Sequence, residues 1–435
     1  MEALEEKFPD TLVVIGVHSA KFPNEQQDEN LHWAVRRHQI THPVVNDADF
    51  AIWEAYGTRA WPTLVLIDPE GYVVGSISGE GHGEALEEAI RKLIQVFRER
   101  GTLVEGPRLF SRPEEASVGV LAFPGKVIAD PTGQRVFIAD SGHHRILTAD
   151  LSGKILDIAG DGKPGQADGS FEQASFRNPQ GLALHGDFLY VADTENHRVC
   201  RLDLKQRTVG AIAGTGNQSL GPPRPGLALN VDLNSPWDLA LRDSRLYIAM
   251  AGSHQIWILD LSTGSLTLFV GSGREMLQDG TRLQASLNQP SGITLDGDTL
   301  YIADSEASAI RAVDLGERAW VKTLVGQGLF DFGDRDGSGP GVRLQHPLGI
   351  ACLDGTLYIV DSYNHKVKTL FPSLGTVSTL WGTGKPGRSA GKEPSFYEPG
   401  GICAAAGKLY IADTNNHRIC IGDPATGEVL PLPLG

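Results

Sequence analysis

The sequence has no long apolar run and only four cysteines, and each shortage excludes a class of protein. No stretch approaches the roughly 18 consecutive apolar residues that a membrane-spanning helix needs. The acidic start, Met1–Glu6, has neither the basic residues nor the apolar segment of a signal peptide. The cysteines are too few and too scattered for a disulfide or zinc framework. We therefore expect a cytoplasmic protein whose thiols are free and buried.

Positive charge is also scarce. The 38 Lys and Arg residues against 53 Asp and Glu residues give a net charge of −15. Such a field repels phosphate backbones, so we expect neither RNA nor a membrane surface as a partner. Glycine, in contrast, is abundant at 52 residues, where about 7% of a chain is usual. This composition predicts a compact protein that is rich in turns.

From about residue 123 to the end, one unit occurs six times. Each unit opens on a Pro-x-Gly element and continues to an aromatic-aliphatic strand that ends in Asp or, once, in Met. The opening prolines are Pro124, Pro179, Pro236, Pro290, Pro347 and Pro399. Four strand-like runs per unit predict an all-β, six-bladed propeller over residues 123–435. The alternative, a linear solenoid, would need polar caps that the sequence does not show.

The predicted architecture also locates the chemistry. We call the strands of each blade a to d, from the axis outward. In such a meander the b–c turns and the blade-to-blade loops share one face, which we call the b–c face. The a–b and c–d turns share the other, which we call the a–b face. The long Gly-rich and Asp-rich connections lie on the b–c face, so we expect any ligand site there, near the axis.

Three residue types recur in the b–c turns. The strand-end aspartates, predicted to be structural, are Asp140, Asp193, Asp304, Asp361 and Asp413. Histidines follow four residues later at His144, His197, His254, His365 and His417. Basic residues follow those at Arg145, Arg198, Lys366 and Arg418. A histidine ring could serve a metal-dependent enzyme near the pore. A feature present in nearly every blade is more typical of a structural role, so we predict no catalytic residue, metal or cofactor. We predict instead that these His, Arg and Lys residues form a surface for a protein or peptide partner.

Residues 1–100 follow a different, alternating α/β pattern, and residues 101–122 are predicted to be a linker. The expected strands are Thr11–Val17, His42–Asn46, Pro62–Ile67 and Tyr72–Ile77, and the expected helices are Glu25–Ile40, Asp49–Tyr56 and Glu84–Arg100. The last two strands form a hairpin around the turn at residues 68–71.

The b–c turns carry a recognisable motif. The strings DTENHR, DSYNHK and DTNNHR resemble NHL repeats, whose assemblies are six-bladed propellers. Trp61-Pro62-Thr63 is similar to the cis-proline loop of the thioredoxin-like fold, a loop that contacts substrate peptide in that fold. The strings IGVHSAKFPNE, ADTENH and LQHPLGI resemble the NHL-repeat-containing protein 2 family, which joins these two domains.

The resemblance implies a multidomain protein: a truncated α/β thioredoxin-like domain followed by a six-bladed NHL propeller. The thioredoxin-like fold carries its Cys-x-x-Cys on a strand before the first helix, and Met1 falls inside that helix. We therefore expect a fragment or a misplaced start, without the redox motif and without the family's C-terminal extension. The expected function is a non-catalytic binding scaffold. The alternative is a thiol–disulfide oxidoreductase whose cysteines lie upstream of Met1.

Overall fold

The computed structural model describes residues 1–106, 119–221, 223–316 and 320–435. The chain divides into two units, residues 1–117 and 118–435. More than half of the predicted linker, residues 101–122, lies outside the described residues. Among the residues described, no helix is both long and apolar enough to cross a bilayer.

The first unit has α/β character, as predicted. Its elements are α1 (Glu2–Lys7), β1 (Gly16–His18), the 3-10 helix η1 (Pro23–Gln26), α2 (Asp28–Arg37), β2 (Val44–Asn46), α3 (Ala51–Ala55), β3 (Thr63–Ile67), β4 (Val73–Ser78) and α4 (Gly83–Glu99). β1 pairs with β2 in parallel across α2, and β3 pairs with β4 as an antiparallel hairpin. A small core of Leu4, Phe8 and Ile90 holds α1 against α4.

Two predicted elements of this unit are wrong in extent. The expected strand Thr11–Val17 is paired only from Gly16 onward, because β2 offers just three residues. The expected helix Glu25–Ile40 is a 3-10 turn followed by α2. The Glu25 carboxylate accepts the Phe22 N–H at 3.0 Å and closes that turn. The helix then ends before Gln39, whose φ is positive.

The second unit is a six-bladed propeller, as the repeats predicted. Blades 1 to 3 are β5 (Val127–Asp130), β6 (Arg135–Asp140), β7 (Arg145–Asp150) and β8 (Ile155–Ala159); β10 (Pro179–His185), β11 (Phe188–Asp193), β12 (Arg198–Asp203) and β13 (Thr208–Ala213); and β15 (Pro236–Arg242), β16 (Arg245–Met250), β17 (Gln255–Asp260) and β18 (Ser265–Val270). Blades 4 to 6 are β19 (Pro290–Asp296), β20 (Thr299–Asp304), β21 (Ala309–Asp314) and β22 (Val321–Val325); β24 (Pro347–Leu353), β25 (Thr356–Asp361), β26 (Lys366–Phe371) and β27 (Thr376–Trp381); and β28 (Gly401–Ala405), β29 (Lys408–Asp413), β30 (Arg418–Asp423) and β31 (Glu428–Pro431).

Short elements from the connections complete the sheets. Three two-residue strands add to outer edges, namely β9 (Gly169–Ser170), β14 (Gly226–Leu227) and β23 (Gly337–Ser338). The 3-10 helices are η2 (Ser141–His143), η3 (Thr194–Asn196), η4 (Ala228–Asn230), η5 (Ala251–Ser253), η6 (Ser305–Ala307), η7 (Gly339–Gly341), η8 (Ser362–Asn364) and η9 (Thr414–Asn416). Six of these helices form the b–c turns.

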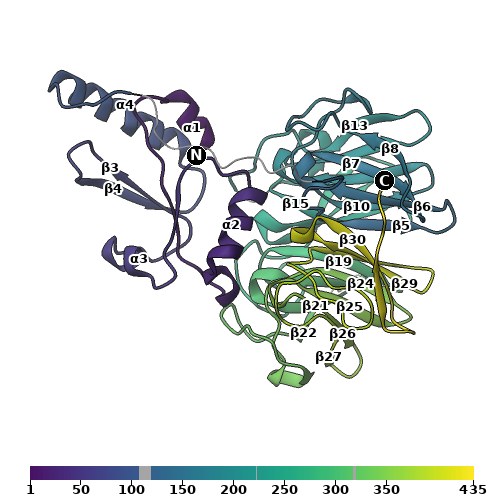
Figure 1. Ribbon diagram of the computed structural model, residues 1–435. Coiled ribbons are helices and arrows are strands. Elements are labelled where there is room, and N and C mark those ends of the chain that lie inside the picture. Colours follow the sequence, from purple (N-terminus) through teal and green to yellow (C-terminus); the bar gives the residue numbers. More distant parts are fainter. Residues whose placement is uncertain (107–118, 222, 317–319) are drawn as a thin grey trace. The chain divides into compact units, whose positions relative to one another are not determined.

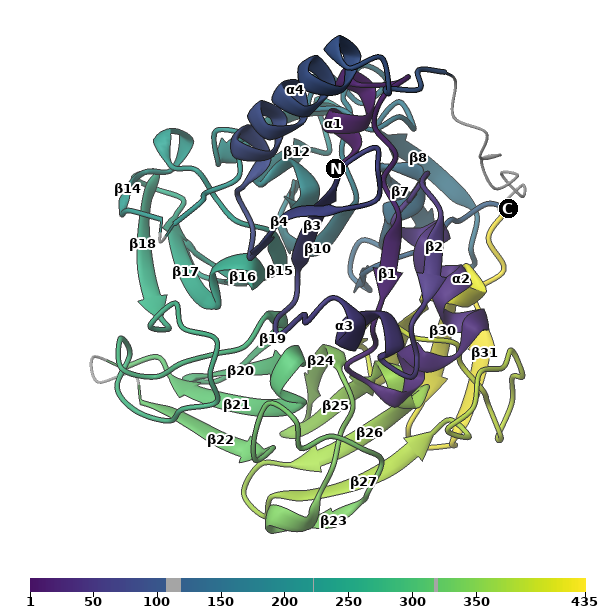
Figure 2. The same ribbon diagram turned by 90° about the vertical axis from the view of Figure 1, so that its left-hand side faces the viewer.

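The blades close into a ring around one axis (Figures 1 and 2). Each inner strand contacts the inner strands of both neighbouring blades, and β28 of the last blade contacts β5 of the first. The alternating pattern of each strand buries apolar side chains on both sides of its sheet. Six apolar cores result, each shared by two adjacent blades.

Each blade takes its four main strands from consecutive sequence, so contacts alone join blade 6 to blade 1. Leu432 is buried in the core that these two blades share. Further on, the Ile155 N–H of β8 donates to the Gly435 carbonyl at 3.4 Å. The residues after β31 therefore cross from the last blade to the first.

Candidate functional site

The six b–c turns share one backbone geometry. A three-residue 3-10 helix follows strand b, and the next residue takes a left-handed conformation with φ between 48° and 57°. Five of these six positions are the predicted histidines, and Ser308 is the sixth. The turn thereby directs each of these side chains toward the following blade.

The histidines form a ring of bonds between neighbouring blades. Each Nδ1 accepts the backbone N–H of the residue before the next blade's opening proline, so the ring proton lies on Nε2. The donor-to-acceptor pairs are Asn178 to His144 (3.1 Å), Ser235 to His197 (3.1 Å), Gln289 to His254 (3.2 Å), Glu398 to His365 (3.1 Å) and Phe123 to His417 (3.0 Å). At the remaining junction the His346 N–H donates to the Ser308 hydroxyl. All six junctions are bonded in this way.

The aspartates and hydroxyl residues of the turns reinforce the same junctions. The strand-end Asp is fully buried in five blades, and its Oδ1 accepts a backbone N–H from the loop that leads into its own blade, as Asp193 does from Arg177 at 2.7 Å. In blades 1, 2, 4 and 6 the hydroxyl residue that follows the Asp donates to the carbonyl of the next blade's opening proline, as Thr194 does to Pro236 at 2.7 Å. The strand-end aspartates, predicted to be structural, therefore fix the loop that leads into each blade.

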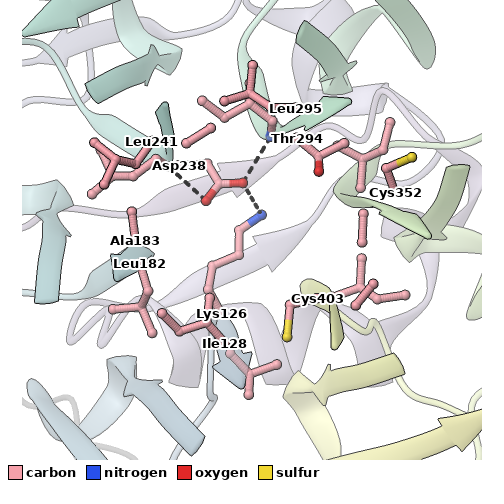
Figure 3. A pocket seen from close by; sticks show the side chains of 18 of the residues that line it. Lys126, Ile128, Leu182, Ala183, Asp238, Leu241, Thr294, Leu295, Cys352 and Cys403 are labelled. Atoms are coloured by element: carbon pink, nitrogen blue, oxygen red, sulfur yellow. Dashed lines mark hydrogen bonds and ion pairs between the residues drawn. The ribbon is translucent and has the colours of Figure 1, made fainter. Parts of the chain in front are cut away.

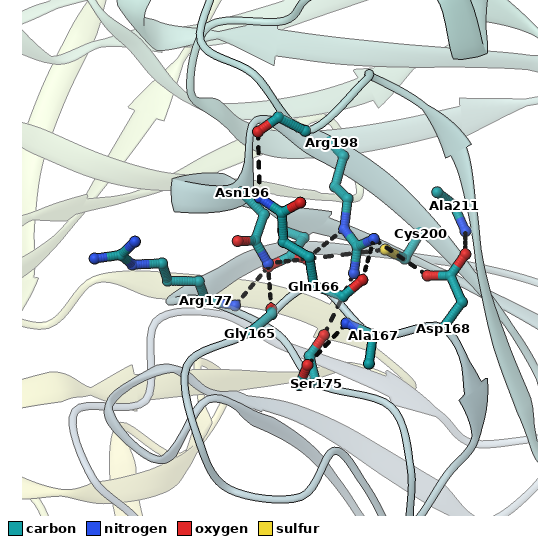
Figure 4. A network of polar contacts seen from close by, with 12 residues as sticks. Gly165, Gln166, Ala167, Asp168, Ser175, Arg177, Asn196, Arg198, Cys200 and Ala211 are labelled. Atoms are coloured by element: carbon teal, nitrogen blue, oxygen red, sulfur yellow. Dashed lines mark hydrogen bonds and ion pairs between the residues drawn. The ribbon is translucent and has the colours of Figure 1, made fainter.

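The basic residues of the motif are buried or half-buried. Arg198 is 7% exposed and donates to Asp193 Oδ2 at 2.9 Å and to the Gln166 carbonyl at 2.9 Å (Figure 4). Burial raises the pKa of Asp193 to about 6, although the bonds from Arg177 N–H, Asn196 and Arg198 oppose that shift. Arg145, Lys366 and Arg418 likewise pair with an aspartate. The positive charge of the predicted partner surface is therefore largely neutralised by these ion pairs.

Sequence reasoning missed two cations of this network. Blade 4 has alanine where the motif has Arg, and Arg311, two residues further along β21, reaches Asp304 at 2.9 Å instead. Lys368 occupies the equivalent position in β26 and contacts Asp361 at 3.3 Å and Asp334 at 2.7 Å. Both side chains are 0% exposed. A Lys or Arg inside an otherwise apolar strand is the signal that could have found them.

Blade 3 departs from the motif in a coordinated way. Met250 replaces the strand-end Asp and Gln255 replaces the Arg, so both charges of the ion pair are absent together. The Gln255 amide donates to the Gly271 carbonyl at 3.1 Å and accepts from the Trp257 indole at 3.0 Å. Blade 3 thus replaces the ion pair by neutral hydrogen bonds and buries no unpaired charge there.

The histidine ring makes stability depend on pH. His365 is 2% exposed, and burial lowers its pKa to about 4. An unfolded histidine titrates near 6.5, so the contribution of His365 is complete above that pH and is lost as the pH falls toward 4. We expect the stability difference between wild type and His365→Gln to shrink by about 3 kcal/mol from pH 7 to pH 4. Chemical denaturation at both pH values measures it.

The matched control is His185→Gln, because His185 is exposed to solvent in β10. Its stability difference from wild type should not change over this range. A constant difference for His365→Gln as well would contradict the assigned neutral Nδ1 acceptor.

The axis holds a second arrangement that sequence reasoning missed. The Pro-x-Gly element is wrong in two of six units, because the third residue is Lys126 in blade 1 and Asp238 in blade 3. At the other four positions the chains approach closely; a Cβ on Gly181 would lie 2.5 Å from Asp238 Cα. The two exceptions meet at the axis, where Lys126 Nζ lies 3.3 Å from Asp238 Oδ2 (Figure 3).

Below this pair lies a cavity of about 300 Å³. It is lined by successive residues of all six inner strands, from Lys126 and Asp238 near the b–c face toward the a–b turns. Apart from that pair, its lining is mostly aliphatic, with Cys352 and Cys403 among the side chains (Figure 3).

The four cysteines are all free. Burial raises the pKa of Cys352 to about 11 and those of Cys403 and Cys420 to about 12. It raises the pKa of Cys200 well above its usual range. Since the thiolate is the nucleophile, none of these thiols is prepared for exchange at neutral pH.

The predicted loop of the first unit is formed. The Trp61–Pro62 peptide is cis, and the Trp61 indole donates to the Ser19 carbonyl at 2.8 Å. The Thr63 hydroxyl donates to the Ala60 carbonyl at 2.7 Å. Trp61 is about half exposed and packs against Trp53, their ring centroids 4.5 Å apart. Among the described residues of the chain, no group of three or more His, Cys, Asp or Glu side chains could hold a metal ion.

Residues 176–202 and 396–421 match the family described as NHL repeat. A six-bladed ring whose junctions are bonded through these turns is an NHL-repeat β-propeller. The fold is also similar to that in the nidogen/laminin complex, at 15% identity over 66% of this chain and 89% of that one, with a TM-score of 0.45. Streptogramin B lyase gives a TM-score of 0.46 at 12% identity, over 72% of this chain and 84% of that one.

Longer proteins match the whole chain. It is 39% identical to NHL repeat-containing protein 2 of Homo sapiens and 40% identical to that of Gallus gallus, over 100% of this chain and 65% of each relative. Protein SUPPRESSOR OF QUENCHING 1, chloroplastic, of Arabidopsis thaliana is 42% identical over 98% of this chain and 43% of its own length. The chain is thus homologous to NHL repeat-containing protein 2 over its full length, and it spans 65% of the length of these animal relatives.

Proposed function

We propose that this chain is a non-catalytic scaffold whose propeller binds a protein or peptide partner on the b–c face. The observation that carries the proposal is the continuous set of bonds through the b–c turns, from His144 around to His417. These bonds hold six turns and their connecting loops in one geometry before any partner arrives. A preorganised surface loses little conformational entropy on binding, which favours affinity.

Exposed charged residues lie beside the bonded motif on the b–c face and are available to a partner. Arg177 and Glu195 of blade 2 are 46% and 41% exposed, and Lys163 is exposed in the loop before them. Among the motif residues predicted to touch the partner, Arg198 donates to the Gln166 and Ser175 carbonyls of the loop that carries Lys163 and Arg177. We propose that recognition uses both sets, with the exposed residues supplying the charge that a partner meets.

Charge reversal on the two faces tests this proposal. We expect Lys163→Glu with Arg177→Glu to abolish co-purification of a protein that wild type captures from its native lysate. The control reverses Asp187 and Asp298 to Lys in a–b turns, where these side chains are 48% and 81% exposed. That variant should capture the same protein as wild type. Loss with the control and retention with the b–c variant would place binding on the other face.

We further propose that residues 1–100 form a thioredoxin-like domain and that the protein works in the cytoplasm. The order of β1, α2, β2 and the β3–β4 hairpin supports the first proposal. The four free cysteines support the second. Thiol–disulfide exchange would need cysteines outside this sequence, because two of its own thiols are buried, two are half-buried, and all four have raised pKa values. An insulin-reduction assay on an upstream-extended protein tests that alternative, and activity there would favour it over a pure scaffold.

A further inference from the structure

Lys126 connects blades that are far apart in the ring. It enters the axis from blade 1, whose neighbours are blades 2 and 6. Its ammonium donates to the Ser291 carbonyl of blade 4 at 2.9 Å and to the Leu348 carbonyl of blade 5 at 2.6 Å, and it pairs with Asp238 of blade 3 at 3.3 Å. One side chain therefore joins four of the six blades.

The surroundings of the nitrogen require the charged form. Three oxygen acceptors face Nζ, and only an ammonium has a hydrogen for each of them. Burial lowers the pKa of Lys126 and raises that of Asp238, and the contact between them opposes both shifts. Asp238 also accepts the backbone N–H groups of Leu239 at 2.9 Å and Ile293 at 3.0 Å. Both buried charges are thus fully hydrogen-bonded.

We propose that the propeller axis carries a binding site for a primary ammonium, built from Asp238 Oδ2 and the Ser291 and Leu348 carbonyls, which this chain fills with its own Lys126. The donor set, one carboxylate and two carbonyl oxygens, is of the kind that holds hard cations. The lysine acts as a cross-ring tie and blocks the axis near the b–c face. This inference goes beyond partner binding and does not depend on it.

The sequence of the inner strands also indicates that Lys126 and Asp238 form a specific pair. Four blades have glycine at this position because the neighbouring backbone leaves no room for a side chain; a Cβ on Gly292 would lie 2.8 Å from the Leu348 carbonyl. The two departures from glycine carry opposite charges and meet each other. A single cross-ring ion pair requires this combination.

Chemical rescue of Lys126→Ala tests the site. The variant leaves the oxygen cage intact and removes three carbons and the ammonium, which together equal n-propylammonium. We expect its Tm to fall by about 5–10 °C and n-propylammonium chloride to restore at least half of the loss. Tetramethylammonium chloride at equal ionic strength, which cannot donate a hydrogen bond, should restore none. The two salts should have the same effect on the Tm of wild type.

Two further variants keep the proposal falsifiable. Lys126→Met should lose stability without rescue, because its side chain still occupies the space. Lys126→Ala with Asp238→Asn should also lack rescue, because the carboxylate of the cage is gone. Equal stability of Lys126→Met and wild type, equal rescue by the two salts, or rescue of the double variant would each overturn the proposal. Lys126→Ala could be unfolded while Lys126→Met is folded. In that case, failure of n-propylammonium to refold Lys126→Ala would also overturn the proposal.

Discussion

Asp193→Ala is expected to cost the propeller about 3–5 kcal/mol of unfolding free energy, because it removes the fully buried carboxylate that pairs with Arg198. Among the residues described, the only carboxylate left to this buried cation would be the half-exposed Asp168, at 3.2 Å. Arg198 would keep its carbonyl contacts but lose the 2.9 Å bond to Asp193. The Arg177 N–H would lose the Asp193 carboxylate that accepts it at 2.7 Å. Denaturant unfolding followed by near-ultraviolet circular dichroism measures the loss.

Two variants frame this result. Asp187→Ala removes an exposed aspartate of the same blade that pairs with Lys205, so it should cost less than about 1 kcal/mol. Asp193→Asn keeps an oxygen for the Arg177 N–H and should fall between the two. A loss for Asp193→Ala no larger than that for Asp187→Ala would show that the b–c turn network contributes little.

Gly401→Ala should be strongly destabilising, because it adds a methyl group where the inner strands of blades 6 and 1 meet. The new Cβ would lie 2.6 Å from the Gly125 carbonyl and 2.8 Å from Lys126 Cα. Both are backbone atoms, so one inner strand must move. We expect a loss of about 3 kcal/mol, at the upper end of ordinary overpacking, with a matching drop in Tm by calorimetry.

The matched control is Gly210→Ala in β13. Nothing lies within 4 Å of a Cβ built there, and its φ is not in the left-handed region. The exchange should raise stability by about 0.4–1 kcal/mol through the unfolded chain. If both alanine variants changed stability in the same direction, the close approach of inner strands would not limit this position.

The fold of residues 123–435 was predictable because the interior of the repeat is constant. The spacing of 14 positions from Pro179 to Asp193 recurs in the later units, so strands and turns keep their register. The partners of the turn residues were not predictable, since His144 bonds to a backbone N–H 34 residues away. That bond depends on how neighbouring blades lie, and no local pattern encodes it.

The axial pair was within reach of sequence reasoning and was missed. Writing the opening element as Pro-x-Gly in all six units hid Lys126 and Asp238, although both letters stand in the sequence. Arg311 was hidden in a similar way, because the motif was sought at a fixed spacing. In both cases the residues that depart from the repeat form buried ion pairs, while the constant positions of the repeat determine the strands and turns.

Closure of the ring by contacts alone has a consequence for its connectivity. Because each blade draws its four main strands from consecutive sequence, the order in which the chain visits the blades can be rotated without breaking a blade. A circular permutant that joins residue 435 to the start of blade 1 and opens at another blade junction would keep every sheet whole. Its new termini would then lie between two blades that the parent chain joins by a continuous connection.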